Sequence, residues 1–224
     1  MSDMLSDRIM MVQKRIADSC KKVARNPDSV RLIVVTKTHP ATVLQQVIDS
    51  GIQDLGENRV QEILEKVPHL SGNFTMHLIG HLQTNKVNKV LPYIRWIHSI
   101  DRQNLIEKIE QHHSGEKIKA LVEVNTSGES SKNGCLPDQC RALCERILAS
   151  RSLELRGLMT IGPLHGTETE TRAAFSLLRK LAESNSDLLS DMELSMGMSG
   201  DYEWAVEEGS TMVRIGSLLL GERN

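Results

Sequence analysis

Short apolar runs alternate with amphipathic segments along the chain from about residue 30 to its end. Several of these runs are continuously apolar instead of alternating, which is typical of parallel strands that are buried on both faces. We therefore expect strands at 32–35, 52–55, 77–79, 96–100, 118–124, 155–161, 192–196 and 212–215.

The segments between the apolar runs have the period of helices. They predict helices at 41–50, 58–67, 85–91, 102–113, 138–150, 169–184, 202–208 and 217–220. Pro40 fits the first helical position of the first of these helices, because its missing N–H would have no intrahelical acceptor there.

Strand–helix alternation that repeats eight times predicts an α/β fold. Eight such units in about 190 residues suit a closed (β/α)8 barrel of the TIM type. A doubly wound open sheet is the alternative, but no G-x-G-x-x-G motif follows the first apolar run. We find no Pro- or Gly-rich linker, so the chain is expected to form a single domain over 1–224.

The first 25 residues predict an additional amphipathic helix (1–25) that precedes the barrel (31–224). Basic residues lie opposite its apolar stripe, and Asn26-Pro27 is expected to end it. The stripe consists of Leu5, Ile9, Val12, Ile16 and Val23.

Composition excludes several classes of function. The formal net charge is −2, from 27 basic and 29 acidic residues, so no electrostatic drive toward nucleic acid or anionic lipid follows. No stretch reaches the roughly 20 apolar residues of a membrane span. The N-terminus carries charges throughout and is neither a signal peptide nor a transit peptide, so we expect a cytoplasmic protein.

The four cysteines do not suggest a metal site. Cys135, Cys140 and Cys144 read C-x4-C-x3-C, which is not the spacing of a zinc ribbon or finger. Cys140 and Cys144 are four residues apart in a helical pattern and are interpreted as small core residues. We expect neither a metal ion nor disulfides.

Polar or glycine residues directly follow nearly every apolar run, and Lys37 follows the first. In (β/α)8 barrels the functional groups gather at the C-terminal ends of the strands. Apolar walls around Lys37 would disfavour its ammonium form, and a neutral amine attacks an aldehyde to give an imine. From this position alone, a solvated loop lysine remains the alternative.

The glycine- and serine-containing loops near the C-terminus suggest a phosphate site. Gly216 and Ser217 stand between the last strand and a short helix, where backbone N–H groups can bind an anion. Phosphate sites in these barrels form from the loops after strands seven and eight, and Ser199 adds a hydroxyl donor there. Two glycine turns without a ligand are the alternative. Together with Lys37, these residues favour a phosphorylated aldehyde as ligand.

The same residues resemble the pyridoxal phosphate homeostasis protein family, a barrel that binds pyridoxal 5′-phosphate (PLP) and is similar to the N-terminal domain of alanine racemases. The matching motifs include VTKT (35–38), GENRVQE (56–62), VNTS (124–127), LSMGMS (194–199) and GSTMVRIG (209–216). The resemblance implies that Lys37 holds PLP as a Schiff base. It also implies that Ser199, Gly216 and Ser217 hold the phosphate group.

By the same resemblance, Arg214 faces the pyridine nitrogen and Asn58 lies beside the ring or its 3-hydroxyl. A guanidinium can only donate a hydrogen bond, so it leaves the pyridine nitrogen unprotonated. The ring is then a weaker electron sink than one paired with a carboxylate, which argues against aminotransferase chemistry. Without the resemblance, a surface or core ion-pair residue is the alternative interpretation of Arg214.

The resemblance leaves carrier and enzyme as competing interpretations. Racemases that share this barrel have a second domain whose tyrosine acts as the opposing acid–base, and only Tyr93 and Tyr202 are present here. We therefore expect a monomeric PLP homeostasis protein without turnover, with PLP-dependent apo-enzymes as candidate recipients of PLP. The alternatives are a small PLP enzyme such as an amino-acid racemase, or a Schiff-base aldolase. Lys86 and Lys89 form either a docking surface for recipients or a solvated face.

Overall fold

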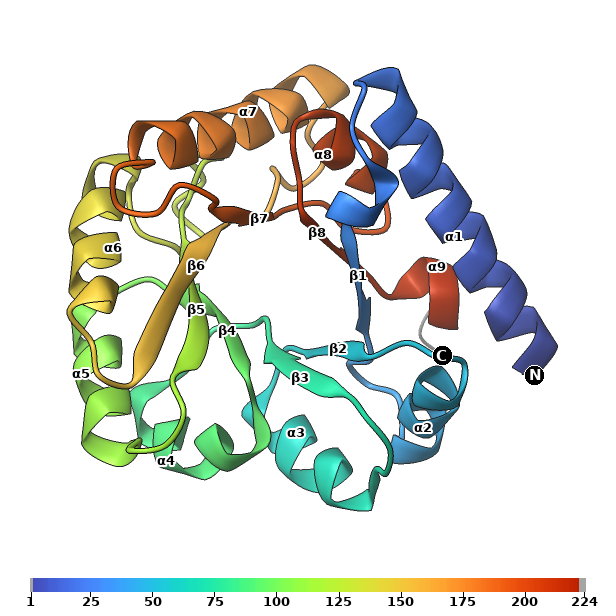
Figure 1. Ribbon diagram of the computed structural model, residues 1–224, viewed down its shortest axis with the longest axis horizontal. Coiled ribbons are helices and arrows are strands. Elements are labelled where there is room, and N and C mark those ends of the chain that lie inside the picture. The colour runs from blue at the N-terminus through green and yellow to red at the C-terminus, as the bar shows by residue number, and fades with distance from the viewer. Residues whose placement is uncertain (1, 222–224) are drawn as a thin grey trace.

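The computed structural model describes residues 2–221, and its centre is a closed barrel of eight parallel strands in chain order (Figure 1). Strand β1 pairs with both β2 and β8, so the sheet has no open edge. The strands are β1 (Arg31–Val35), β2 (Asp54–Glu57), β3 (Thr75–Leu78), β4 (Trp96–Ile100), β5 (Ile118–Glu123), β6 (Leu153–Met159), β7 (Glu193–Ser195) and β8 (Met212–Ile215). The predicted (β/α)8 barrel is confirmed.

Helices surround the barrel and alternate with the strands, as Figure 1 shows. They are α2 (Ala41–Asp49), α3 (Val60–Lys66), α4 (Val87–Val90), α5 (Gln103–His112), α6 (Cys140–Leu148), α7 (Glu168–Ser184), α8 (Tyr202–Glu207) and α9 (Ser217–Leu220). The predicted helix 85–91 is shorter than expected, because 3-10 turns at Thr84–Lys86 and Leu91–Tyr93 flank α4. Pro40 is the residue before α2 and not its first helical residue.

The N-terminal helix α1 (Ser2–Lys22) packs against α8 and α9 (Figure 1). It ends before Asn26-Pro27, because Ala24 adopts a left-handed backbone with a φ of 54°. The expectation that Val23 belongs to the buried stripe is wrong, since Val23 lies beyond the helix and is 39% exposed. Cys20, which is fully buried, completes the stripe instead.

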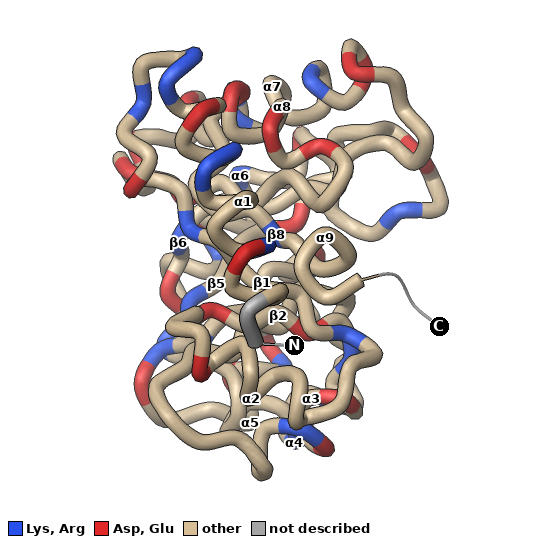
Figure 2. Tube along the Cα trace, turned by 90° about the vertical axis from the view of Figure 1, so that its right-hand side faces the viewer, with Lys and Arg blue, Asp and Glu red and all other residues tan. Residues whose placement is uncertain are grey.

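Apolar side chains fill both the space between barrel and helices and part of the barrel interior. The interior group consists of Ile33, Trp96, Leu121, Met159 and Met212. The interpretation of Cys140 and Cys144 as core residues is confirmed, and Cys20 and Cys135 are buried thiols as well. Basic and acidic residues are interspersed along the trace in Figure 2. Within residues 2–221, every helix is too short or too polar to cross a membrane.

Gly157 marks the closest approach of two neighbouring strands. It lies on β6 with a φ of +152°, and a Cβ built there would overlap the backbone carbonyl oxygen of Glu193 on β7. Since neither backbone can move without breaking the ladder, Gly157→Ala should lower the free energy of unfolding by about 3 kcal/mol or more, measured by urea titration.

Gly51→Ala is the matched control for this substitution. Gly51 also has a positive φ, +92°, but a Cβ there meets no atom within 4 Å. Gly51→Ala should lower the free energy of unfolding only by the cost of a left-handed backbone at a residue with a Cβ, about 1–2 kcal/mol. Equal losses in the two variants would contradict a steric role for Gly157.

Candidate functional site

A cavity of about 690 Å³ opens at the C-terminal ends of the barrel strands. Its volume is in the range of small-molecule sites. Apolar walls come from Val35, Ile79, Ile161 and Met198. The cavity brings together the residues predicted to bind a cofactor, namely Lys37, Asn58, Ser199, Arg214, Gly216 and Ser217.

Lys37 lies in a turn two residues after the end of β1, and the backbone on both sides of it is anchored. The preceding residue, Thr36, accepts a hydrogen bond at its carbonyl oxygen from Lys66 Nζ at 3.1 Å. The following residue, Thr38, has a φ of 67° and donates its N–H to the Glu62 carboxylate at 2.6 Å. The turn therefore holds the start of the Lys37 side chain in a defined place at the cavity.

The anchor beneath this turn is a buried cluster of one cation and two carboxylates. Lys66 Nζ lies 2.8 Å from Glu57 Oε1 and 2.6 Å from Glu62 Oε2. Burial raises the pKa of Glu57, although Lys66 and Thr36 oppose the shift. Burial acts in the same direction on Glu62, but hydrogen bonds from Lys66 and Thr38 outweigh it and lower that pKa. Sequence reasoning missed this cluster, although the i, i+4 spacing of Glu62 and Lys66 indicates a pair.

Arg214 lies on β8 with only 4% of its surface exposed, and it forms part of the cavity lining. Its Nη1 donates to Ser195 Oγ at 2.6 Å, and its Nη2 donates to the Thr160 carbonyl oxygen at 2.9 Å. Burial lowers the pKa of the guanidinium to about 10, partly opposed by Asp201 and Glu123, so it stays a cation at neutral pH. Both acceptors are uncharged, which differs from the ion-pair interpretation.

Hydroxyl groups from the loops after β7 and β8 also line the cavity. Ser199 lies in the loop after β7, where the Asp201 carboxylate accepts the N–H of Met198 at 2.6 Å and fixes the turn. Ser217 is the first residue of α9, and a Cβ at Gly216 would sit 3.0 Å from the Val35 carbonyl oxygen. The glycine therefore lets the end of β8 lie close against β1.

Glu123 and His81 are cavity residues to which sequence reasoning gave no role. Glu123 ends β5 and is 5% exposed; burial, with a contribution from Asp101, raises its pKa to about 7, while Arg214 opposes the shift. His81 Nδ1 lies 3.4 Å from Asp101 Oδ2. An acidic residue inside the apolar run 118–124 was the available signal for Glu123.

Comparison with known proteins shows similarity over nearly the whole chain. The family model of the alanine racemase N-terminal domain matches residues 13–224. The pyridoxal phosphate homeostasis protein of Aquifex aeolicus is 39% identical, with 97% of each chain covered. The protein of that name from Homo sapiens is 40% identical, over 90% of this chain and 82% of the human one.

Solved structures share the fold. PipY of Synechococcus elongatus, solved with PLP bound, is 34% identical with a TM-score of 0.85, over 97% of this chain and 100% of PipY. A crystal structure described as that of an unknown protein from Bifidobacterium adolescentis is 37% identical with a TM-score of 0.92, over 98% of this chain and 95% of that one. Alanine racemase of Corynebacterium glutamicum is 12% identical with a TM-score of 0.75, and this chain spans 61% of its length. That last likeness shows the fold alone.

The raised pKa of Glu123 has a direct consequence for stability. Because the folded-state pKa of about 7 lies above the unfolded value of 4.5, the stabilising effect is complete below pH 4.5 and is lost as pH rises through 7. The loss is about 3 kcal/mol. In Glu123→Gln this loss should vanish, so the variant gains stability over the wild type between pH 5 and 8 in urea unfolding.

Glu116→Gln is the control, because Glu116 lies on the exposed segment before β5. Its stability relative to the wild type should stay constant over the same range. A Glu123→Gln difference that is also independent of pH would contradict the raised pKa.

Proposed function

Because the chain belongs to the pyridoxal phosphate homeostasis protein family, we propose that it holds PLP as a Schiff base on Lys37 and acts in intracellular PLP (vitamin B6) homeostasis. The observation that carries the proposal is the meeting of Lys37, Arg214 and Ser199 around one apolar-walled cavity. PipY, a solved relative, has PLP bound.

The groups that line the cavity match the functional groups of PLP. PLP supplies a reactive aldehyde on an electron-withdrawing ring. In our proposal the Lys37 amine adds to the aldehyde carbon, and the carbonyl oxygen leaves as water. The apolar residues Val35 and Ile79 provide a wall for the ring.

Arg214 is proposed to donate to the pyridine nitrogen. Its Nη1 and Nη2 already have acceptors within the protein, but a guanidinium carries five N–H donors and has capacity left for a ligand. Because it stays a cation at neutral pH, it cannot accept a proton from the ring. This keeps the nitrogen unprotonated and limits the ring as an electron sink, which supports holding over turnover.

The phosphate is proposed to bind at Ser199, Gly216 and Ser217, where two hydroxyl groups line the cavity. Gly200, also a lining residue, has open space at its Cβ position, so the backbone there can approach an anion closely. Asn58 follows β2 and offers amide donors, which we assign to the ring or its 3-hydroxyl.

A small PLP enzyme such as a racemase is the second candidate, and one observation favours it. His81, paired with Asp101, and Glu123 both line the cavity and can carry a proton. Neither Tyr93 nor Tyr202 is among the described residues that line the cavity. The structure therefore offers no support for a tyrosine that acts as the opposing acid–base. The carrier remains our proposal, because neither tyrosine is among the described residues that line the cavity.

The proposal includes a monomer in the cytoplasm that passes PLP to PLP-dependent apo-enzymes. Lys86 and Lys89 are both exposed, on the segment that follows β3. They are available there for a recipient with an acidic surface.

Lys37→Ala should abolish the visible absorption band of the PLP adduct while leaving the fold intact, because no other amine is proposed to condense with the aldehyde. Absorption spectra before and after borohydride, followed by peptide mass analysis, test this. Lys132→Ala is the control, since Lys132 lies in the loop after β5 and donates to the Gly162 carbonyl oxygen. A retained band in Lys37→Ala would refute the anchor, and amino-acid turnover above the Lys37→Ala background would refute the carrier role.

Ser199→Ala should weaken PLP binding about tenfold, because it removes one hydrogen bond to a charged phosphate, an effect of roughly 1–3 kcal/mol. Equilibrium titration with PLP measures the loss. Ser190→Ala, at an exposed position, should bind as the wild type does. Unchanged affinity in Ser199→Ala would remove Ser199 from the phosphate site.

A further inference from the structure

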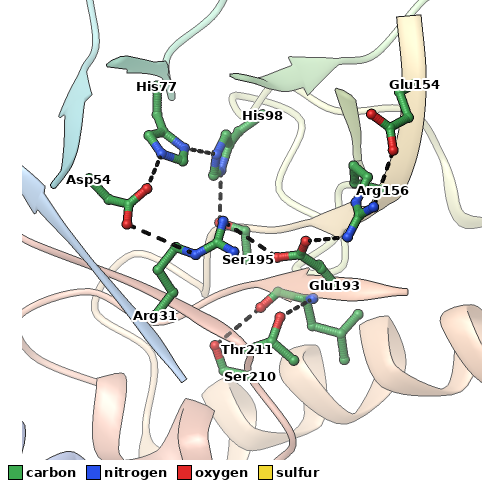
Figure 3. A network of polar contacts seen from close by, with 11 residues as sticks. Arg31, Asp54, His77, His98, Glu154, Arg156, Glu193, Ser195, Ser210 and Thr211 are labelled. Carbon is green, nitrogen blue, oxygen red and sulfur yellow. Dashed lines mark hydrogen bonds and ion pairs between the residues drawn. The ribbon is translucent and has the colours of Figure 1, made fainter. Parts of the chain in front are cut away.

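A continuous chain of hydrogen-bonded polar side chains begins at Arg214 and crosses the barrel interior. Ser195 Oγ, which accepts from Arg214, lies 3.0 Å from His98 Nδ1. His98 Nε2 lies 3.0 Å from His77 Nδ1, and His77 Nε2 lies 2.8 Å from Asp54 Oδ1. Figure 3 shows the part of this chain from Ser195 to Asp54, with its members on β7, β4, β3 and β2.

The two ends of the chain determine the direction of every hydrogen bond in it. Arg214 can only donate, and an ionised Asp54 carboxylate can only accept, so His77 carries its proton on Nε2. A neutral His77 then accepts at Nδ1 from His98 Nε2–H. His98 in turn accepts at Nδ1 from the Ser195 hydroxyl, whose lone pair accepts from Arg214. Every proton is thus donated toward Asp54.

Burial supports neutral imidazoles in the middle of this chain. Both His77 and His98 are fully buried, and His77 stacks on Trp96 with ring centroids 5.4 Å apart. Burial lowers the pKa of His77, which Asp54 partly opposes, and lowers the pKa of His98 well below its usual value, to which His77 and Arg214 add. Neither ring is therefore charged at neutral pH.

The end of the barrel at which the strands begin carries a compact set of charges. Arg31 lies 4.0 Å from Asp54 and 3.8 Å from Glu193, and Glu193 pairs with Arg156 at 3.1 Å (Figure 3). Lys119 and Arg31 each lie 5.3 Å from the Trp96 ring. Of these charged residues, Asp54 is the one that accepts a hydrogen bond from His77. It is therefore the end of the polar chain that begins at Arg214.

We propose that Ser195, His98, His77 and Asp54 are positioning residues that orient the Arg214 guanidinium and couple the charge of Asp54 to the cofactor ring. This inference rests on the proposed function, in which Arg214 faces the pyridine nitrogen. Because Ser195 gives its proton to His98, its lone pair points at Arg214 and fixes one edge of the guanidinium. Chains of hydrogen bonds polarise one another, so a carboxylate at the far end strengthens the bond to Arg214.

Asp54→Asn and Glu193→Gln form a matched pair of variants. Each removes one carboxylate charge beside Arg31, but only Asp54 accepts from His77. An amide at position 54 can also donate to His77, so the direction of the chain is no longer fixed. Asp54→Asn should weaken PLP binding about tenfold and displace the absorption maximum of bound PLP, whereas Glu193→Gln should stay within about twofold and keep the maximum.

Ser195→Ala tests the upper end of the chain and should reproduce both changes. Thermal unfolding of each variant separates a loss of fold from a loss of coupling, since a purely structural effect leaves the absorption maximum in place. Equal effects of Asp54→Asn and Glu193→Gln on affinity and spectrum would overturn the inference.

The direction of the chain is measured without PLP, by ¹⁵N NMR of the histidine rings in the wild-type protein at pH 7. Both His77 and His98 should be neutral with the proton on Nε2. A proton on Nδ1 of His98, or a charged ring, would overturn the inference. Absence of a borohydride-reducible PLP adduct in the wild type would instead refute the proposed function, and the ring tautomers would still decide the direction of the chain.

Discussion

The burial of the Arg214 guanidinium is the constraint on which the barrel interior depends. A cation removed from water must find acceptors, because an unpaired charge in a low-dielectric interior is strongly disfavoured. Thr160 meets this need with a carbonyl oxygen, and Ser195 meets it with a hydroxyl oxygen. The Ser195 hydroxyl group is itself a donor and also requires an acceptor, which His98 provides. The polar chain from Ser195 to Asp54 inside the barrel thus follows from the burial of Arg214.

Lys66 is a second buried cation beside the cavity, and it is satisfied in the opposite way. Its ammonium group has three donors, and Glu57, Glu62 and the Thr36 carbonyl oxygen accept from it. No donor capacity remains for a ligand, so Lys66 holds the turn of Lys37 in place. Arg214 is bound by two uncharged acceptors and retains both its charge and unused donors. The same physical problem therefore yields a clamp at Lys66 and, in the proposed site, a ligand-binding group at Arg214.

The sequence pattern predicted the barrel because the buried strands are apolar on both faces, and the runs 96–100 and 212–215 match β4 and β8 in full. It failed at the end of the first helix: α1 ends at Lys22, before the left-handed Ala24, which no composition signal marks. Strand-end positions predicted which side chains line the cavity. They could not predict that His98 meets His77, since that contact depends on the register between β3 and β4.

A PLP enzyme needs groups that carry protons and a ring that acts as a strong electron sink. Different residues of this cavity bear on each of these two requirements. A group able to carry a proton is present, because burial raises the pKa of Glu123 to about 7, and the His81 imidazole also lines the cavity. A strong electron sink requires a protonated pyridine nitrogen, and in the proposed site the donor-only Arg214 would leave that nitrogen unprotonated. In that arrangement the electronic state of the ring limits aminotransferase chemistry, whatever acids and bases line the cavity. If Arg214 faces the ring as proposed, the chain of His98 and His77 behind Ser195 holds the guanidinium as a donor and supplies no carboxylate to the ring.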